Sequence, residues 1–204
     1  RHSINWSLFL GIPSASGIIL LAEPIIISLF HYGEMTTYDV HQCMKSLRGY
    51  ALGLPAFILI KVLVTAYFAK KDMVTPVKIA VFALFINTVL NLVLMQYFGH
   101  AGLALATSMA AWLNASLLFI CLKTSEEKLS REGLLNCLRI IIASVTMLIV
   151  LFWSISNTTF SVEAVFWLRF LYLFFLIFIG CLTYLAVYYV MGMNKGKINR
   201  LYGI

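Results

Sequence analysis

The stretch AYFAKKDMVTPVKIAVFALF, residues 66–85, joins two long apolar segments through a short charged interruption. Lys70, Lys71 and Asp72 end the first segment, and the chain becomes apolar again after Thr75 and Pro76. Threonine often caps the start of a helix, and proline suits the first helical position because its missing N–H has no partner there. The pattern predicts a turn between two helices, with Thr75 as the N-cap of the second.

The composition indicates that these helices lie in a membrane. Hydrophobic residues make up 62% of the 204 residues, only 11% are charged, and the mean hydropathy is +0.94. A soluble domain carries about a quarter of its residues charged. Backbone groups in lipid are satisfied only in helices or closed barrels, and the alternation typical of barrel strands is absent. We therefore expect an all-α integral membrane protein with six transmembrane helices, near Trp6–Phe30, Leu47–Ala69, Val77–Phe98, Gly102–Leu122, Leu134–Ile155 and Val165–Met191.

The basic residues predict how the helices are oriented. Eleven Lys and Arg residues fall at the ends that would share one side with the 66–85 turn, whereas three fall on the other side, and Lys61 lies within a span. Cytoplasmic loops are enriched in Lys and Arg, so both ends of this chain should be cytoplasmic. The net charge of +7 is then a consequence of topology and does not indicate nucleic-acid binding. Because the chain starts with Arg1 and has no signal-peptide pattern, we expect it to be the C-terminal piece of a larger protein.

Charged residues inside the spans are candidates for function. Lys61 lies nine residues, or roughly 13 Å of helix, before Lys70, which places it somewhat to the cytoplasmic side of the bilayer midplane. It can face an aqueous cavity and attract an anionic ligand, or it can extend to the interface or pair with a carboxylate for packing. Glu23, directly before Pro24, has mainly a structural interpretation. Lys61 and, nearer the outside, Arg48 are the candidate substrate-binding residues.

Polar and small residues mark two further features of the spans. Asn87 and Asn91 are four residues apart and share a helix face, and Thr107 and Asn114 follow in the next span. These groups can line a small cation pocket or form hydrogen bonds between helices. Small residues also recur at helical spacing, which lets helices approach closely. They form one stripe at Gly102, Ala106, Ala110 and Asn114, and a GxxxG pair at Gly49 and Gly53 before Pro55.

Motifs of hydrolases, metalloproteases and P-loop ATPases are absent from the sequence, so an enzyme is not expected. Three segments instead resemble the C-terminal half of the MurJ/MviN family, the lipid II flippases of peptidoglycan synthesis. They are GLPAFILIKVLVTAYFAKKDMVTPVKIA (residues 53–80), HAGLALATSMAAWLNASLLF (100–119) and LFHYGEMTTYD (29–39). The resemblance extends from about Ile12 to Leu122, and the last two spans match by position and character.

The resemblance implies a fourteen-helix transporter of which this chain would form helices nine to fourteen. Residues 1–123 would be the last four helices of the C-terminal lobe, 124–133 a cytoplasmic loop, and 134–204 two extra helices, which line a groove for lipid, with a basic cytoplasmic tail. The family moves undecaprenyl-pyrophosphate-linked disaccharide-pentapeptide across the bacterial inner membrane by alternating access, through a cationic cavity. Its principal cavity arginines lie outside the region that this chain matches.

The resemblance also implies site residues. Lys61 is the matching intramembrane base. A monovalent cation, Na⁺, can bind the family's second lobe at positions that correspond to Asn87, Asn91, the Leu103 carbonyl and Thr107, and no other cofactor is implied. An acidic residue can occupy the Asn91 position in the family, so the amide removes a charge. Two alternatives stay open, namely a related exporter of another lipid-linked polysaccharide or a drug, and a membrane scaffold that does not transport.

Overall fold

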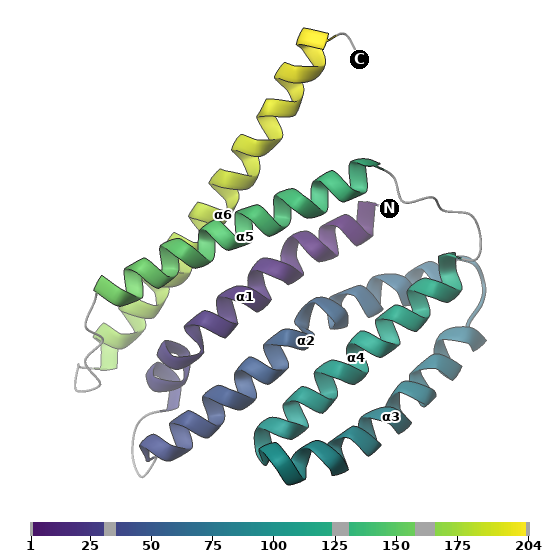
Figure 1. The fold of residues 1–204 in the computed structure, drawn as a ribbon, viewed down its shortest axis with the longest axis horizontal. Helices are drawn as coiled ribbons and strands as arrows, with labels where there is room; N and C mark the ends of the chain where they lie inside the picture. Colours follow the sequence, from purple (N-terminus) through teal and green to yellow (C-terminus); the bar gives the residue numbers. More distant parts are fainter. Residues whose placement is uncertain (1, 31–35, 124–130, 158–165, 203–204) are drawn as a thin grey trace.

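The structure, a computed structural model, describes residues 2–30, 36–123, 131–157 and 166–202, and all of these ranges are helical apart from short connections. Figure 1 shows the six helices. They are α1 (His2–Phe30), α2 (Thr37–Ala69), α3 (Val74–Phe98), α4 (His100–Lys123), α5 (Arg131–Asn157) and α6 (Phe166–Tyr202).

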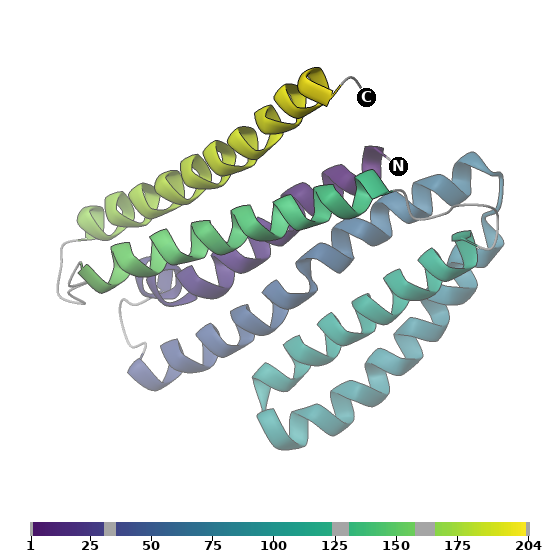
Figure 2. The same cartoon turned by 45° about the horizontal axis from the view of Figure 1, so that its top comes forward.

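The helices form a curved row in the spatial order α3, α4, α2, α1, with α5 and α6 beyond α1 (Figures 1 and 2). α4 packs between α3 and α2, and α1 packs against α2, α5 and α6. α3 hardly touches α2, and the C-terminal pair packs on no helix other than α1 within the described residues. A row of this kind leaves both of its broad faces open along most of its length.

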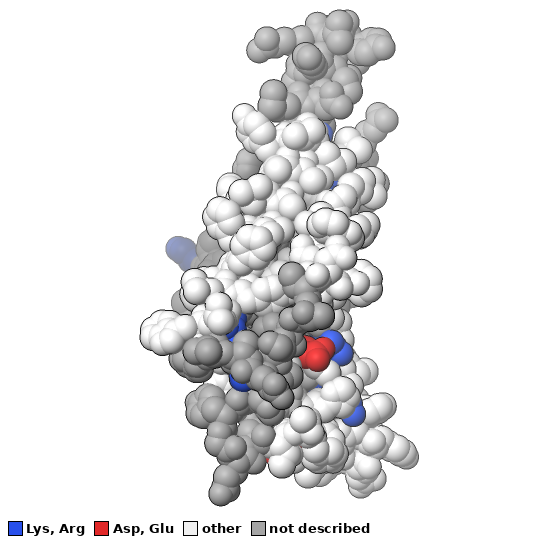
Figure 3. Space-filling model, turned by 90° about the vertical axis from the view of Figure 1, so that its left-hand side faces the viewer, with Lys and Arg blue, Asp and Glu red and all other residues white. Residues whose placement is uncertain are grey.

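All six helices are long and apolar enough to cross a membrane, so this is a multi-pass membrane protein, as the composition predicted. Figure 3 views the end that carries the α1–α2 and α5–α6 connections, where few charged side chains interrupt an uncharged surface. α6 continues as a helix to Tyr202, ten residues past the apolar span that ends at Gly192. The short interfacial helix considered near residues 124–130 lies outside the described residues.

The turn in the 66–85 stretch has the predicted position but a different capping residue. Lys71 adopts a left-handed conformation with φ of 60°, its N–H donates to the Phe68 carbonyl at 2.9 Å, and the N–H of Asp72 donates to the Tyr67 carbonyl at 3.1 Å. These two bonds form a Schellman motif that ends α2. The carboxylate of Asp72 then accepts from the N–H groups of Val74 and Thr75 at 3.1 and 3.0 Å. Asp72 therefore caps α3, and the prediction of Thr75 as N-cap is wrong because the helix begins before it.

The α1–α2 and α3–α4 connections are both shorter than the apolar pattern predicted. α2 begins at Thr37, ten residues before the apolar segment, because Thr36 and Asp39 form a capping box in which each side chain accepts from the other residue's N–H. The α3–α4 connection is Gly99 alone, which has φ of 57° and donates its N–H to the Met95 carbonyl. Hydrogen bonds at helix ends, which hydropathy does not report, set these boundaries.

The GxxxG pair brings α2 and α4 into close contact. A Cβ added to Gly49 would lie 2.8 Å from the Ala104 Cβ, and one added to Gly53 would lie 2.6 Å from the Ser108 Oγ. The Ser108 hydroxyl uses this proximity to donate to the Gly49 carbonyl at 2.6 Å. The small residues that face α2 are therefore Ala104, Ser108, Ala111 and Ala115, which are buried.

The predicted stripe on α4 faces the other neighbour. A Cβ on Gly102 would overlap the backbone of Leu94 in α3, and Ala106 and Ala110, which follow at four-residue spacing, are buried. α4 thus carries small residues on two nearly opposite faces, one for each adjacent helix.

Candidate substrate face and cation pocket

Lys61 lies on an open face of the row. Its side chain is exposed, and it has no hydrogen-bond or ion-pair partner among the residues that the structure describes. On an ideal helix Lys61 lies about 120° from Gly49, which faces α4, and about 140° from Arg48, which faces α1. The ammonium group consequently points away from both neighbours of α2, as a residue that meets a ligand must.

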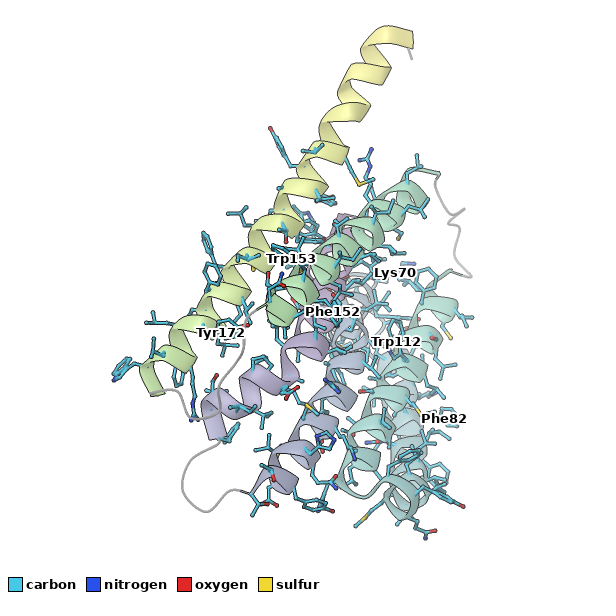
Figure 4. The ribbon with its side chains drawn as sticks, turned by 60° about the vertical axis from the view of Figure 1, so that its left-hand side comes forward. Lys70, Phe82, Trp112, Phe152, Trp153 and Tyr172 are labelled. Atoms are coloured by element: carbon cyan, nitrogen blue, oxygen red, sulfur yellow. The ribbon has the colours of Figure 1, made fainter. Side chains whose placement is uncertain are left out.

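The opposite face of the α2–α4 pair is identified by Trp112, which is labelled on α4 in Figure 4. Its indole N–H donates to the Leu52 carbonyl of α2 at 2.9 Å. Leu52 lies about 180° around α2 from Lys61, and Trp112 lies about 140–160° around α4 from Thr107 and Asn114. Lys61, Thr107 and Asn114 therefore share one face of the row, and Trp112 lies on the other.

Three asparagine side chains on α3 and α4 have unusual surroundings. The Oδ1 atoms of Asn87, Asn91 and Asn114 are buried and have no hydrogen-bond partner within the described part of the chain. An unsatisfied buried carbonyl oxygen costs roughly 1–3 kcal/mol, so such groups call for a ligand or donor. Within the described residues, the three oxygens do not accept the interhelical hydrogen bonds that membrane asparagines commonly form.

The four predicted cation ligands divide between two facing helices and span about two helical turns in depth. Because Gly102 meets Leu94 where the antiparallel helices α3 and α4 pack, Asn91 lies opposite about residue 105, between Leu103 and Thr107. The Thr107 hydroxyl donates to the Leu103 carbonyl at 2.8 Å, in addition to the helical bond that this carbonyl accepts from the Thr107 N–H, so the free lone pairs are those of the hydroxyl oxygen. Asn87 lies one turn nearer the start of α3. All four groups offer oxygen atoms, the donors that hard cations prefer.

Arg48 does not join Lys61. The two residues are separated by about 20 Å along α2 and about 140° around it. The Arg48 Nε donates to the Ile19 carbonyl of α1 at 3.1 Å, one residue before the carbonyl that Pro24 deprives of its helical donor. Glu23 is exposed on α1. The structure therefore gives Arg48 a helix-packing contact, while Lys61 lies on the open face with Thr107 and Asn114.

Sequence reasoning missed two residues whose side chains bond helix carbonyls close to a proline. Trp112 bonds a carbonyl three residues before Pro55, and Tyr184 donates its hydroxyl to the Phe9 carbonyl, four residues before Pro13. For Tyr184 the available signal was Pro13 itself, since proline removes the helical donor of the carbonyl four residues earlier and calls for another donor from a neighbouring helix.

Known proteins resemble this chain in sequence and in the arrangement of their helices. The sequence model of the family described as lipid II flippase MurJ matches residues 1–174. The chain belongs to the MurJ family. The resemblance noted from three short segments is thereby confirmed, and the match extends well into the C-terminal pair of helices.

Individual MurJ relatives agree along most of the chain. A probable lipid II flippase MurJ of Vibrio cholerae is 36% identical over 198 residues, 95% of this chain and 38% of the relative. One from Rickettsia prowazekii is 38% identical over 153 residues, 74% of this chain and 30% of the relative. A solved lipid II flippase MurJ in an inward closed conformation superposes with a TM-score of 0.78 at 28% identity, covering 94% of this chain and 38% of that one.

The chain thus spans about two fifths of the length of the Vibrio MurJ relative and of the solved MurJ structure. The open faces of the row agree with this fraction, because a transporter needs a second wall opposite Lys61 to enclose a path.

Proposed function

We propose that this chain is the C-terminal part of a lipid II flippase that moves undecaprenyl-pyrophosphate-linked disaccharide-pentapeptide from the inner to the outer leaflet. The family match over residues 1–174 is the observation that carries this proposal. In the complete transporter the chain would form helices nine to fourteen, with residues 1–123 in the C-terminal lobe, 124–133 as a cytoplasmic loop and 134–204 as the added helices and tail. Its substrate is lipid II, and it has no enzymatic role.

Lys61 is the proposed contact for the substrate's pyrophosphate. An ammonium on an open face within a span attracts an anion strongly, because the surrounding hydrocarbon screens charge poorly. The long side chain can follow the headgroup over several ångströms while α2 stays in place. Arg48 is proposed as a second basic contact on the outer half of α2, since its Nε bond to Ile19 uses one of the five donors of its guanidinium group.

A Na⁺ site is proposed between α3 and α4. The two orphaned oxygens of Asn87 and Asn91, with the Leu103 carbonyl and the Thr107 hydroxyl, fit a small hard cation in their donor chemistry. When bound, the ion would supply a positive charge that holds α3 and α4 together at this depth. The set is neutral, so it favours a monovalent ion over a divalent one.

The proposed location is the bacterial inner membrane, with both ends of this chain in the cytoplasm. The Lys- and Arg-rich ends, including the α2–α3 turn, support this orientation. The missing wall of the path would come from the N-terminal lobe of the same protein.

Complementation tests the proposal. A bacterium depleted of its own lipid II flippase would receive the protein as its gene encodes it, the Lys61→Ala variant or the Lys70→Ala variant, and lipid II on each leaflet would be measured. We expect Lys70→Ala to match wild type and Lys61→Ala to lower flipping roughly tenfold or more, the loss expected for one hydrogen bond to a charged group.

Two results would contradict parts of this proposal. If Lys61→Ala flips as well as wild type, Lys61 is not a substrate contact. If the wild-type protein inserts stably and leaves lipid II on the inner leaflet, the substrate is another lipid-linked polysaccharide or a drug, or the protein is a scaffold.

A further inference from the structure

Pro13 leaves one backbone carbonyl of α1 without its helical donor. In an α-helix the N–H of residue 13 would donate to the carbonyl of residue 9, and proline has no N–H. The Phe9 carbonyl accepts a hydrogen bond of 2.8 Å from the Tyr184 hydroxyl of α6 instead. Tyr184 therefore replaces, from another helix, the hydrogen bond that Pro13 removes.

The packing between α6 and α1 around Phe9 positions the Tyr184 hydroxyl. Tyr184 is 5% exposed, and its ring lies 5.3 Å from that of Phe9. Tyr188, one turn later on α6, packs on the same Phe9 ring at 4.6 Å, yet it makes no hydrogen bond within the described residues. Aromatic packing thus holds α6 against α1, and the hydroxyl of Tyr184 alone satisfies the carbonyl.

Pro13 of α1 lies at nearly the same depth as Pro55 of α2. A Cβ on Gly11, two residues before Pro13, would lie 3.1 Å from the Pro55 Cα across the α1–α2 contact. Near Pro55 the Leu52 carbonyl is bonded by Trp112 of α4. Two neighbouring helices, one of which carries Lys61, therefore have a proline at a common level, and at Pro13 a side chain of another helix replaces the lost backbone donor.

We propose that Tyr184 is a latch that couples bending of α1 at Pro13 to the docking of the C-terminal pair α5–α6. In hydrocarbon no water can satisfy the Phe9 carbonyl, so it stays bonded only while Tyr184 is in place. Movement of α6 away from α1 releases this carbonyl and changes the shape of the helix that borders α2. Helices α5 and α6 thereby control how α1 bends at Pro13.

A double-mutant cycle tests this assignment in the full protein reconstituted in lipid nanodiscs. The variants are Tyr184→Phe, Pro13→Ala and the two combined, and Tyr188→Phe is the matched control that loses a hydroxyl from the same cluster. Hydrogen–deuterium exchange is measured on peptides covering residues 6–17 of α1, with a peptide from α3 as an internal reference.

With Pro13 present, Tyr184→Phe should raise exchange near residues 10–17 about fivefold, the factor expected for one net hydrogen bond. In the Pro13→Ala protein, residue 13 supplies its own N–H to the Phe9 carbonyl, so Tyr184→Phe should have almost no further effect. The Tyr188→Phe variant should exchange like wild type.

Equal effects of Tyr184→Phe in the wild-type and Pro13→Ala proteins would overturn the proposal, because the hydroxyl would then not be replacing the helical donor. The same holds if Tyr188→Phe matches Tyr184→Phe, or if Tyr184→Phe leaves exchange unchanged. None of these results depends on which lipid the protein transports, so they are separate from the complementation test.

Discussion

At the scale of single residues, Asp72 illustrates how one residue can end one membrane helix and start the next. Its N–H completes the end of α2, and its side chain caps the start of α3. Hydrogen bonds from the side chain and the backbone N–H of Thr75 hold the pKa of Asp72 below its usual range. The ionised form is thus the one that caps the helix.

Acid should weaken this cap. Because the folded pKa is lowered, the contribution of Asp72 to stability is present above the unfolded pKa, about 3.9, and is lost as the pH falls through the folded value. We expect Asp72→Ala to lower the thermal midpoint at pH 7, and Asp72→Asn, which also caps helices, to retain it. Thermal unfolding in detergent between pH 7 and pH 3 measures this.

Subtracting the thermal midpoint of Asp72→Asn from that of wild type at each pH cancels the contribution of the other acidic residues. The difference between wild type and Asp72→Asn should change below about pH 4, where only the carboxylate is protonated. A difference that stays constant with pH would mean that the Asp72 carboxylate does not cap α3 in solution.

Asn91 gives a second prediction at this scale, for the proposed cation pocket. Asn91→Asp adds a negative charge beside the Leu103 carbonyl and Thr107, so Na⁺ should bind more tightly and raise the thermal midpoint by more than it does in wild type. Potassium or choline chloride at equal ionic strength is the control. If Asn91→Asp responds no differently to Na⁺ than to choline, the pocket is not a sodium site.

At the scale of helices, the α2–α4 contact depends on the absence of two side chains. Gly49 and Gly53 let the Ser108 hydroxyl reach a backbone carbonyl, and without a hydrophobic driving force in lipid such close packing is the main source of helix association. α4 repeats this arrangement toward α3 through Gly102. It is the helix that joins the outer part of the row to the rest.

Gly53→Ala should therefore destabilise the protein. The new Cβ would lie 2.6 Å from the Ser108 Oγ and 3.0 Å from the Ser108 Cα, so the helices must separate, at a cost of about 1–3 kcal/mol. Gly192→Ala is the control, since a Cβ there meets nothing within 4 Å. Thermal unfolding in detergent compares them, and equal midpoints for both variants and wild type would show that the α2–α4 spacing can relax.

At the scale of the whole molecule, the row of helices has more apolar surface than it can cover. In the most apolar window of α3 only 6% of the residues are buried, and Phe82 on α3 and Phe152 and Trp153 on α5, labelled in Figure 4, are exposed at 50, 65 and 68%. Lipid and other apolar helices are the environments that suit such surfaces.

The orientation of the row can be tested directly. In a protein whose Cys43, Cys121, Cys137 and Cys181 are replaced by Ala, a membrane-impermeant thiol reagent should label Lys71→Cys only from the cytoplasmic side. Tyr97→Cys, 78% exposed at the other end of α3, should be labelled only from outside. Intact cells compared with inverted vesicles measure this, and the reverse labelling pattern would overturn the proposed topology.

Several features could be predicted because they depend on the local sequence. Six apolar runs with charged ends produced six helices, and the charged interruption after Tyr67 produced a turn. Helix ends were predicted less well, as at Thr36 and Gly99, because capping bonds and left-handed residues set them. The direction of Lys61 away from its neighbours could not be predicted, since it depends on which faces of α2 the other helices cover.

The sequence by itself determined that the chain lies in a membrane, how many times it crosses and to which family it belongs, because hydropathy and motif strings are properties of consecutive residues. Only the tertiary structure decided which polar groups share a face. It separated Arg48 from Lys61, left three asparagine oxygens without partners in the described part of the chain, and brought Tyr184 to a carbonyl 175 residues earlier in the chain. Those relations depend on how the helices pack, because packing decides whether a polar group within one helix meets a partner on another.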